Sequence, residues 1–154
     1  MSWVPYRQGV TPVPHPSTYV RVTGVGGLVS ARVRAVLDTG ATVTVIPTAI
    51  LRSVGAYQLT GRTARCRGYD GATALLPLFE VDLAVDDPRW PDDLRVRFER
   101  LLVLGVTAPS QPDGDSAGAS SRASGSAPEV LIGLDVLAAW RLHLDGPQSR
   151  YSVE

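Results

Sequence analysis

Short runs of apolar residues, many of them alternating with polar residues, recur along most of this 154-residue chain. The clearest run covers residues 79–85, in which every second position is Phe, Val or Leu and the positions between hold Glu, Asp and Ala. Alternation with a period of two indicates a β-strand with one buried face. Turn signals separate the runs. We therefore expect strands near residues 18–25, 28–37, 43–46, 57–67, 79–85, 94–98 and 101–104, an apolar segment at 130–133, and a closing hairpin at Gly146-Pro147.

Two segments are better suited to short helices. Thr48 is positioned to cap a helix over residues 49–54 that stops at Gly55, and a second helix is expected over residues 134–140. Strands outnumber these helices and most connections between them are short. The pattern predicts an all-β, barrel-like domain with a short C-terminal helix.

Two further segments differ from the rest in composition. Residues 1–16 contain four prolines, which predicts an extended N-terminal segment without helix. Residues 107–128 are mostly Ser, Gly, Ala, Pro and Asp, with little to bury, and predict a disordered insertion or a mobile surface loop. We expect residues 17–154 to form one domain, because the chain is long enough for one core and short for two.

Composition excludes several function classes. The 15 Arg residues balance 15 Asp and Glu residues, so no long-range field favours nucleic acid or an anionic membrane. No apolar run reaches the roughly 18 residues of a membrane span. One cysteine rules out an internal disulfide framework, and one Cys with two separated His makes no metal site. We expect a cytoplasmic protein without a cofactor, metal, nucleic-acid partner or membrane partner.

The sequence Asp38-Thr39-Gly40-Ala41 lies between the apolar runs 33–37 and 43–46. Asp is depleted in strands, and a buried unpaired charge is costly. The turn must therefore either give the Asp38 carboxylate hydrogen-bond partners or use it for chemistry. A structural Asp that bonds its own turn is the first of these alternatives, and a catalytic Asp is the second.

The context of this motif resembles that of the retropepsin-like aspartic proteases, single-domain homodimeric relatives of pepsin. The strongest matches are the run Val36-Leu37-Asp38-Thr39-Gly40-Ala41 and, near the C-terminus, Leu131-Ile132-Gly133 before a helix. The resemblance covers roughly residues 18–153, interrupted by the 107–128 insertion. It implies a closed-barrel-like acid protease lobe and an aspartic endopeptidase (a hydrolase).

The resemblance also implies a role for each matching residue. Asp38 would be the catalytic carboxylate, Thr39 would bond to its twin across a dimer axis, and Gly40 would allow the tight turn. Leu131-Ile132-Gly133 would cross behind this loop. The turn at Tyr69, Asp70 and Gly71 would be the tip of a flap that closes over a peptide or protein substrate.

One Asp38 per chain is only half of such a site. Two carboxylates about 3 Å apart share a single proton, and the pair activates a water molecule to attack a peptide carbonyl. The chain contains no second Asp-Thr-Gly or Asp-Ser-Gly. The resemblance therefore implies a C2 homodimer with the active site on its axis.

One feature departs from the viral members of the family, which carry a basic residue after the apolar-apolar-Gly segment and an acidic partner shortly after Asp-Thr-Gly-Ala. Here those positions hold Leu134 and Thr42. The dimer would have to be secured in another way. Terminal strands near residues 3–6 or 151–153 are candidates.

Several alternatives stay open. A catalytically inactive binding or dimerisation module could keep this fold, and a small β-barrel ligand carrier would be a monomer. Arg62, Arg65 and Arg67 could select acidic substrates, although a solvated strand face is the simpler interpretation. Cys66 as a nucleophile lacks a nearby His in the sequence. Side-chain pockets for substrate are expected at Val43, Ile46 and the flap.

Overall fold

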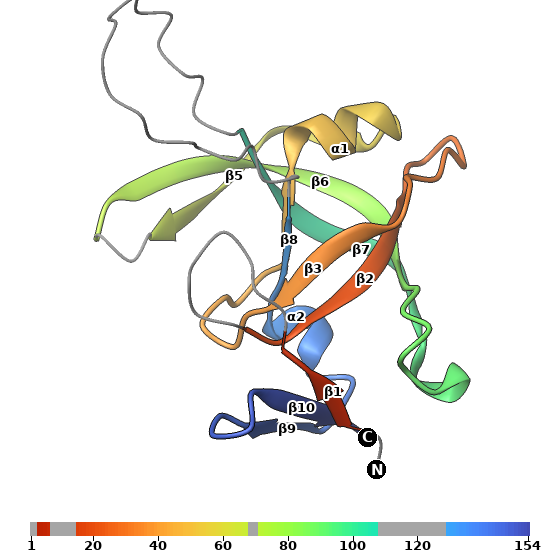
Figure 1. Cartoon of the computed structure of the whole chain (residues 1–154). Coiled ribbons are helices and arrows are strands. Elements are labelled where there is room, and N and C mark those ends of the chain that lie inside the picture. The colour runs from red at the N-terminus through yellow and green to blue at the C-terminus, as the bar shows by residue number, and fades with distance from the viewer. Residues whose placement is uncertain (1–2, 7–14, 68–70, 108–128) are drawn as a thin grey trace, which may run out of the picture.

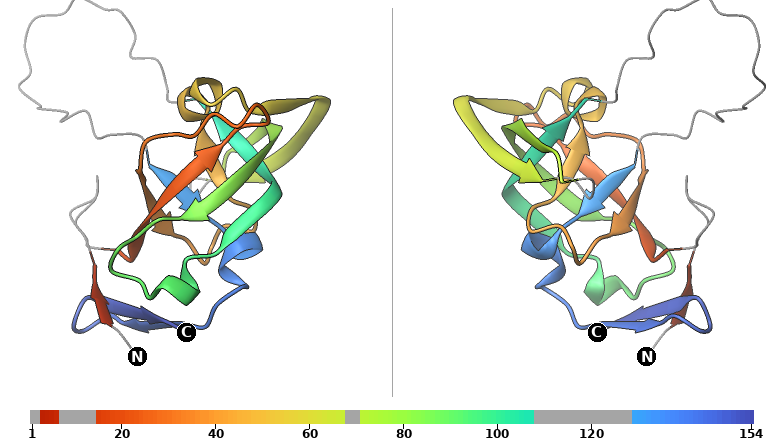
Figure 2. Two further views of the ribbon diagram at one scale, coloured as in Figure 1. Left: turned by 90° about the vertical axis from the view of Figure 1, so that its right-hand side faces the viewer. Right: turned by 90° about the vertical axis from the view of Figure 1, so that its left-hand side faces the viewer.

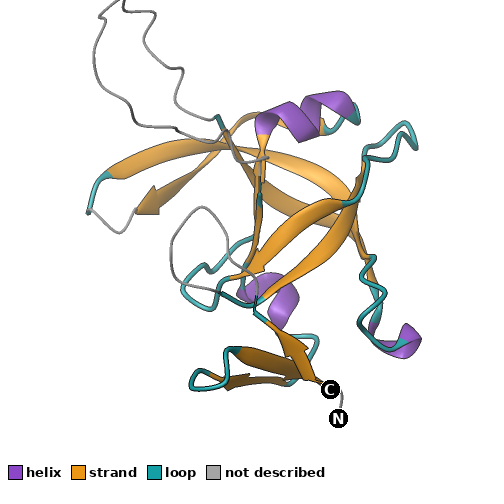
Figure 3. Ribbon diagram, viewed as in Figure 1, coloured by secondary structure: helices purple, strands orange, loops and turns teal. Residues whose placement is uncertain are grey.

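The computed structural model describes residues 3–6, 15–67, 71–107 and 129–154, and within these the strands form two sheets (Figures 1 and 3). The prediction of an all-β protein is confirmed. The larger, seven-stranded sheet has the order β2 (Ser17–Thr23), β3 (Val33–Leu37), β8 (Val130–Ile132), β4 (Val45–Pro47), β7 (Arg97–Val106), β6 (Thr73–Val85) and β5 (Tyr57–Arg67). Because β2 also pairs with β6, the strand order closes into a ring, with β5 outside it.

The smaller sheet contains β1 (Trp3–Pro5), β10 (Arg150–Val153) and β9 (Leu142–Asp145), in that order. It lies at one end of the molecule beside both labelled termini (Figures 1 and 2). β1 lies within the predicted extended segment 1–16, where it pairs antiparallel with β10. The terminal strands therefore pair with each other within one chain.

The alternating pattern at 79–85 forms the second half of β6, where Phe79, Val81, Leu83 and Val85 are buried. Two predicted strands, 94–98 and 101–104, are largely one strand, β7. Val81 pairs with Leu101 and Leu83 with Phe98, so β7 carries an extra residue at this point. Arg100 there has a positive φ of 53°. A bulge of this kind breaks the alternation without ending the strand.

Other predicted boundaries shift. The predicted strand 28–37 begins only at Val33, because Ser30 turns back to bond Val22 through both its backbone N–H and its hydroxyl oxygen. Helix α1 (Thr48–Ser53) forms close to the predicted position, but Thr48 is its first residue and not its cap, because Pro47 occupies the cap position. Helix α2 (Leu134–Leu137) ends earlier than predicted. Beyond it, the N–H groups of Ala139 and Trp140 bond three residues back, to Val136 and Leu137, so these residues form turns. The Trp140 ring stands edge-on to Trp90 with centroids 5.2 Å apart.

The core lies inside the ring of strands and continues to the smaller sheet. Its fully buried side chains come from both sheets and both helices and include Val20, Val22, Ile46, Leu51, Leu83, Ile132, Val136 and Tyr151. No helix in the described ranges is long and apolar enough to cross a membrane. The predicted insertion, apart from Thr107, lies outside the described residues.

Candidate active site

The Asp38 loop joins β3 to β4, with β8 lying between these two strands. β3 pairs with β8 in parallel, with Leu37 opposite Ile132, and β4 pairs with it through Val45 and Leu131. β8 therefore crosses behind the loop.

The Asp38 carboxylate is half-buried and accepts a hydrogen bond at Oδ1 from the N–H of Gly40, 2.9 Å away. Its second oxygen, Oδ2, has no hydrogen-bond donor among the described residues. The backbone N–H of Asp38 donates to Ile132 O over 2.9 Å. Thr39 and Gly40 are exposed at the tip of the loop. The turn thus satisfies one carboxylate oxygen and leaves the other available.

The segment after β8 holds the remainder of the loop through backbone hydrogen bonds. The N–H of Leu134 donates to Ala41 O over 2.8 Å, and that of Asp135 donates to Thr42 O over 3.2 Å. Gly133 lies directly against Val43, since a Cβ at Gly133 would be 2.6 Å from the Val43 carbonyl carbon. Any other residue at position 133 would displace the loop.

Sequence reasoning missed two residues of this site, Thr44 and Asp135. Thr44 is fully buried, and both its backbone N–H and its hydroxyl bond to the Asp135 carboxylate. The signal was present in the sequence as a polar residue within the otherwise apolar run 43–46. A buried hydroxyl requires a hydrogen-bond partner, but the run does not reveal which residue supplies it.

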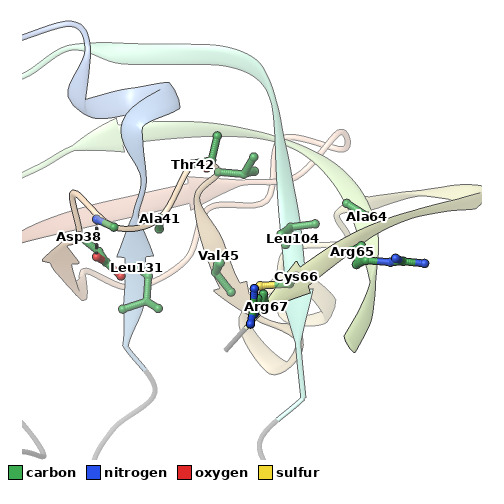
Figure 4. A pocket seen from close by; sticks show the side chains of 12 residues that line it. Asp38, Ala41, Thr42, Val45, Ala64, Arg65, Cys66, Arg67, Leu104 and Leu131 are labelled. Carbon is green, nitrogen blue, oxygen red and sulfur yellow. Dashed lines mark hydrogen bonds between the residues drawn. The ribbon is translucent and has the colours of Figure 1, made fainter. Parts of the chain in front are cut away.

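A cavity of about 510 Å³ opens beside Asp38 (Figure 4). One wall is apolar and includes Val43, Val45, Leu104 and Leu131, and the opposite wall is the end of β5, from Ala64 to Arg67. The volume lies within the range of pockets that hold small ligands or side chains. Val43, one of the two residues expected at a substrate pocket, lines this cavity, whereas Ile46 is fully buried in the core and does not.

The strands β5 and β6 form a hairpin whose ends pair at Arg67 and Thr73, and the hairpin extends beyond the neighbouring strands (Figure 1). Of the predicted flap tip, Tyr69 and Asp70 lie outside the described residues. Gly71 is described and has a φ of +81°, a left-handed conformation suited to glycine. The β5 end of this hairpin, from Ala64 to Arg67, lines the same cavity as Asp38.

Charged groups are unevenly distributed around the cavity. Asp38 is its only lining carboxylate among the described residues, and Arg65 and Arg67 also line it without a described ion-pair partner. Arg62 does not line it. In Figure 4 the Arg65 side chain points away from the other lining residues, which accords with a solvated strand face.

The structure also describes the other residues that the sequence singled out. Thr42 and Leu134 are both exposed. Cys66 is a free, half-buried thiol that lines the cavity, while neither His15 nor His143 does. Within the described ranges, no group of three His, Cys, Asp or Glu side chains is placed to hold a metal ion.

Comparison of the chain with protein-family models found no match. Comparison with curated proteins likewise found none.

Proposed function

We propose that this protein is an aspartic endopeptidase with a retropepsin-like lobe, active as a homodimer. The observation that carries the proposal is the Asp38 carboxylate, which has one oxygen fixed by Gly40 N–H and the other without a described donor, at the edge of a 510 Å³ cavity. The closed strand order and the crossing of β8 behind the loop support the same fold assignment.

A second copy of the chain completes the site in this proposal. Thr39 and Gly40 are exposed beside Asp38, so the tip of the loop is accessible to an identical loop. Rotation about a twofold axis would place the two Asp38 carboxylates together, and each copy would contribute the same residues. The interface is isologous, and one active site serves two chains.

The reaction follows from a proton shared by the two carboxylates. The ionised Asp38 accepts a proton from a water molecule as the water oxygen adds to the peptide carbonyl carbon, and the protonated Asp38 donates its proton to the carbonyl oxygen. Proton transfer to the amide nitrogen then accompanies cleavage of the C–N bond. The pair titrates as a unit, so neither copy has a permanent role as acid or base.

The substrate in this proposal is an extended peptide between the Asp38 loop and the β5–β6 hairpin. Backbone hydrogen bonds to such a peptide resemble those of an added strand. The apolar wall formed by Val43, Val45, Leu104 and Leu131 suits an apolar side chain of the substrate.

A catalytically inactive binding or dimerisation module is the second candidate. The hydrogen bond from Gly40 N–H to Asp38 Oδ1 favours it, because a purely structural Asp makes the same bond. A peptidomimetic inhibitor with a hydroxyl group in place of the scissile carbonyl separates the two. Tight binding that is lost in Asp38→Asn supports the enzyme, since only a paired-carboxylate site has a reason to prefer that group.

The direct test is digestion of a peptide library with the wild type, Asp38→Asn and the control Asp93→Asn. Asn keeps the oxygen that accepts from Gly40 N–H but cannot act as a base. We expect Asp38→Asn to lower kcat/KM by about 10²–10⁴-fold, with the melting temperature and dimer unchanged. Asp93 is exposed and remote from the cavity lining, so Asp93→Asn should retain full activity. Undiminished cleavage by Asp38→Asn would refute the mechanism.

A further inference from the structure

We propose that Asp135 is a positioning residue that holds the Asp38 loop in place through Thr44. The expected effect on catalysis rests on the proposed function. The effect on the position of the loop can be tested without any peptide cleavage. Asp135 lies at the start of α2, and Thr44 lies at the end of the Asp38 loop, 91 residues away in sequence.

Both oxygens of the Asp135 carboxylate accept hydrogen bonds from this one residue. The Thr44 hydroxyl donates to Asp135 Oδ1 over 2.8 Å, and the Thr44 backbone N–H donates to Oδ2 over 3.0 Å. Two bonds from one residue fix both the position of the backbone and the rotamer of the threonine. Hydrogen bonds to an ionised acceptor are stronger than those between neutral groups.

The Thr44 hydroxyl also accepts a hydrogen bond, from the N–H of Gly133 over 3.2 Å. The bonds form a directed chain from Gly133 N–H to the Thr44 oxygen, and from the Thr44 hydroxyl to Asp135. Thr44 is fully buried, and Gly133 is buried as well. Loss of the Asp135 carboxylate leaves buried donors without their partner, which costs more than the loss of an exposed hydrogen bond.

These bonds complete a continuous contact between two short segments. Each residue from 132 to 135 bonds to the loop: Ile132 to Asp38, Gly133 to Thr44, Leu134 to Ala41, and Asp135 to both Thr42 and Thr44. The contacts at Asp38, Ala41 and Thr42 join backbone to backbone and do not depend on side-chain identity. The contact at Thr44 depends on the Asp135 side chain. Asp135 therefore controls the position of the backbone at the point where the loop joins β4.

The two positions that form an ion pair in the viral members of the family cannot link these segments through their side chains. Thr42 and Leu134 cannot form one, and both are exposed. In this chain the hydrogen bonds between Thr44 and Asp135 join the same two segments instead. Thr44 is fully buried, whereas Asp135 is exposed, so the pair links a buried donor residue to a carboxylate at the surface.

Positioning of this loop has a direct catalytic consequence. Two copies of Asp38 must meet within hydrogen-bonding distance. A displacement of the loop occurs in both copies, so it changes the distance between the two carboxylates from both sides. A misplacement of 1 Å in a catalytic group can cost about 10²-fold in rate. Loss of the Asp135 carboxylate should therefore lower kcat. KM should change less, because the hairpin and the part of the cavity wall formed by Leu104 and Leu131 lie outside the loop.

The experiment compares Asp135→Ala, Thr44→Val and Thr44→Ser with the control Asp93→Ala, each as the full chain. Hydrogen–deuterium exchange measured by NMR reports the backbone amides of Asp38, Gly40 and Ala41. We expect Asp135→Ala and Thr44→Val to accelerate their exchange by at least about ten-fold relative to the amides of β6. Thr44→Ser keeps the hydroxyl and should restore protection, and Asp93→Ala should match the wild type.

Kinetics on one peptide substrate provide the second measurement. We expect Asp135→Ala to lower kcat per folded dimer by about 10–10²-fold with KM within about two-fold of the wild type. Asp135→Ala combined with Thr44→Val should lower kcat by less than the product of the two single effects, because both remove the bond from the Thr44 hydroxyl to Asp135. Unchanged exchange at the Asp38 loop, or a lower melting temperature with unchanged kcat, overturns the proposal. Accelerated exchange in a chain whose wild type cleaves nothing supports the positioning role and refutes the proposed function.

Discussion

Trp90 Nε1 donates a hydrogen bond to the Tyr151 hydroxyl over 3.1 Å, and both side chains are almost completely buried. The Tyr151 hydroxyl in turn donates to the carbonyl oxygen of Ser17 over 2.7 Å. Tyr151 belongs to the small sheet, Ser17 begins β2, and Trp90 lies in the connection between β6 and β7. This one hydroxyl therefore attaches the strands at the chain ends to the ring of strands that carries the candidate site.

Tyr151→Phe tests this attachment. The variant keeps the ring and removes only the hydroxyl, which leaves the buried Trp90 N–H without its acceptor. The Ser17 carbonyl loses one of its donors and keeps the bond from Arg89 Nη2 over 2.9 Å. We expect the free energy of unfolding to fall by about 1–3 kcal/mol, measured by urea denaturation. Tyr57→Phe is the control, because Tyr57 is 56% exposed and should change stability little. Equal stability of the two variants would contradict the expectation.

Asp87 forms the most buried ion pair of the described chain. Its side chain is fully buried, Arg89 donates to both of its oxygens, and the Thr18 hydroxyl donates to Oδ2 over 3.1 Å. Burial by itself would raise the pKa of Asp87, but the hydrogen bonds and the charge of Arg89 outweigh it and hold the pKa below its usual value.

The lowered pKa of Asp87 makes stability depend on pH in a defined direction. The stabilisation is fully present above the unfolded-state pKa of about 3.9 and is lost as pH falls through the lower folded-state pKa. We expect Asp87→Asn to lower the free energy of unfolding at pH 7 by about 3–5 kcal/mol, because Arg89 loses its counter-ion. The variant should also lose part of the acid-side decline, as measured by urea denaturation at several pH values below 5.

Part of that decline should persist in Asp87→Asn. Hydrogen bonds from Arg97 lower the pKa of Asp82, and those from Arg32 and Arg21 lower the pKa of Asp86. Asp93→Asn serves as the control and should change the free energy of unfolding at pH 7 by less than about 0.5 kcal/mol. An Asp87→Asn variant with the full wild-type decline would show that this ion pair is not its source.

Gly133→Ala tests the close packing of β8 on the Asp38 loop. The added Cβ would meet the Val43 backbone at 2.6 Å, and the strain is steric because Gly133 has an ordinary φ of −90°. We expect a loss of about 1–3 kcal/mol in the free energy of unfolding, together with reduced peptide cleavage. Gly146→Ala is the matched control, since its Cβ would meet nothing within 4 Å. Equal effects of the two substitutions would contradict the packing argument.

Mixing wild-type chains with Asp38→Asn chains tests whether the site is shared. If each active site needs one Asp38 from each copy, equal amounts co-refolded at random leave roughly one quarter of the dimers active. If each chain carried its own site, half of the activity would remain. The measurement is specific activity against the mixing ratio, and a linear dependence would exclude the shared site.

The features that local patterns predicted are those that depend on neighbouring residues. The alternation at 79–85 identified one face of β6, because successive side chains of a strand point to opposite sides whatever the strand pairs with. Asp38-Thr39-Gly40 was identified as a turn because glycine permits close backbone approach. Its catalytic role stays a prediction. The predicted α2 boundary was wrong, because Ala139 and Trp140 bond three residues back and form turns, which the apolar pattern does not reveal.

The sequence alone thus determined the strand content and the position of the Asp38 turn. The tertiary structure alone decided what those residues meet. β2 closes on β6, β1 pairs with β10, and Thr44 finds Asp135 across 91 residues. Period-two alternation reports which face of a strand is buried, but it carries no information on which distant backbone or carboxylate lies opposite, and only folding of the whole chain brings those groups together.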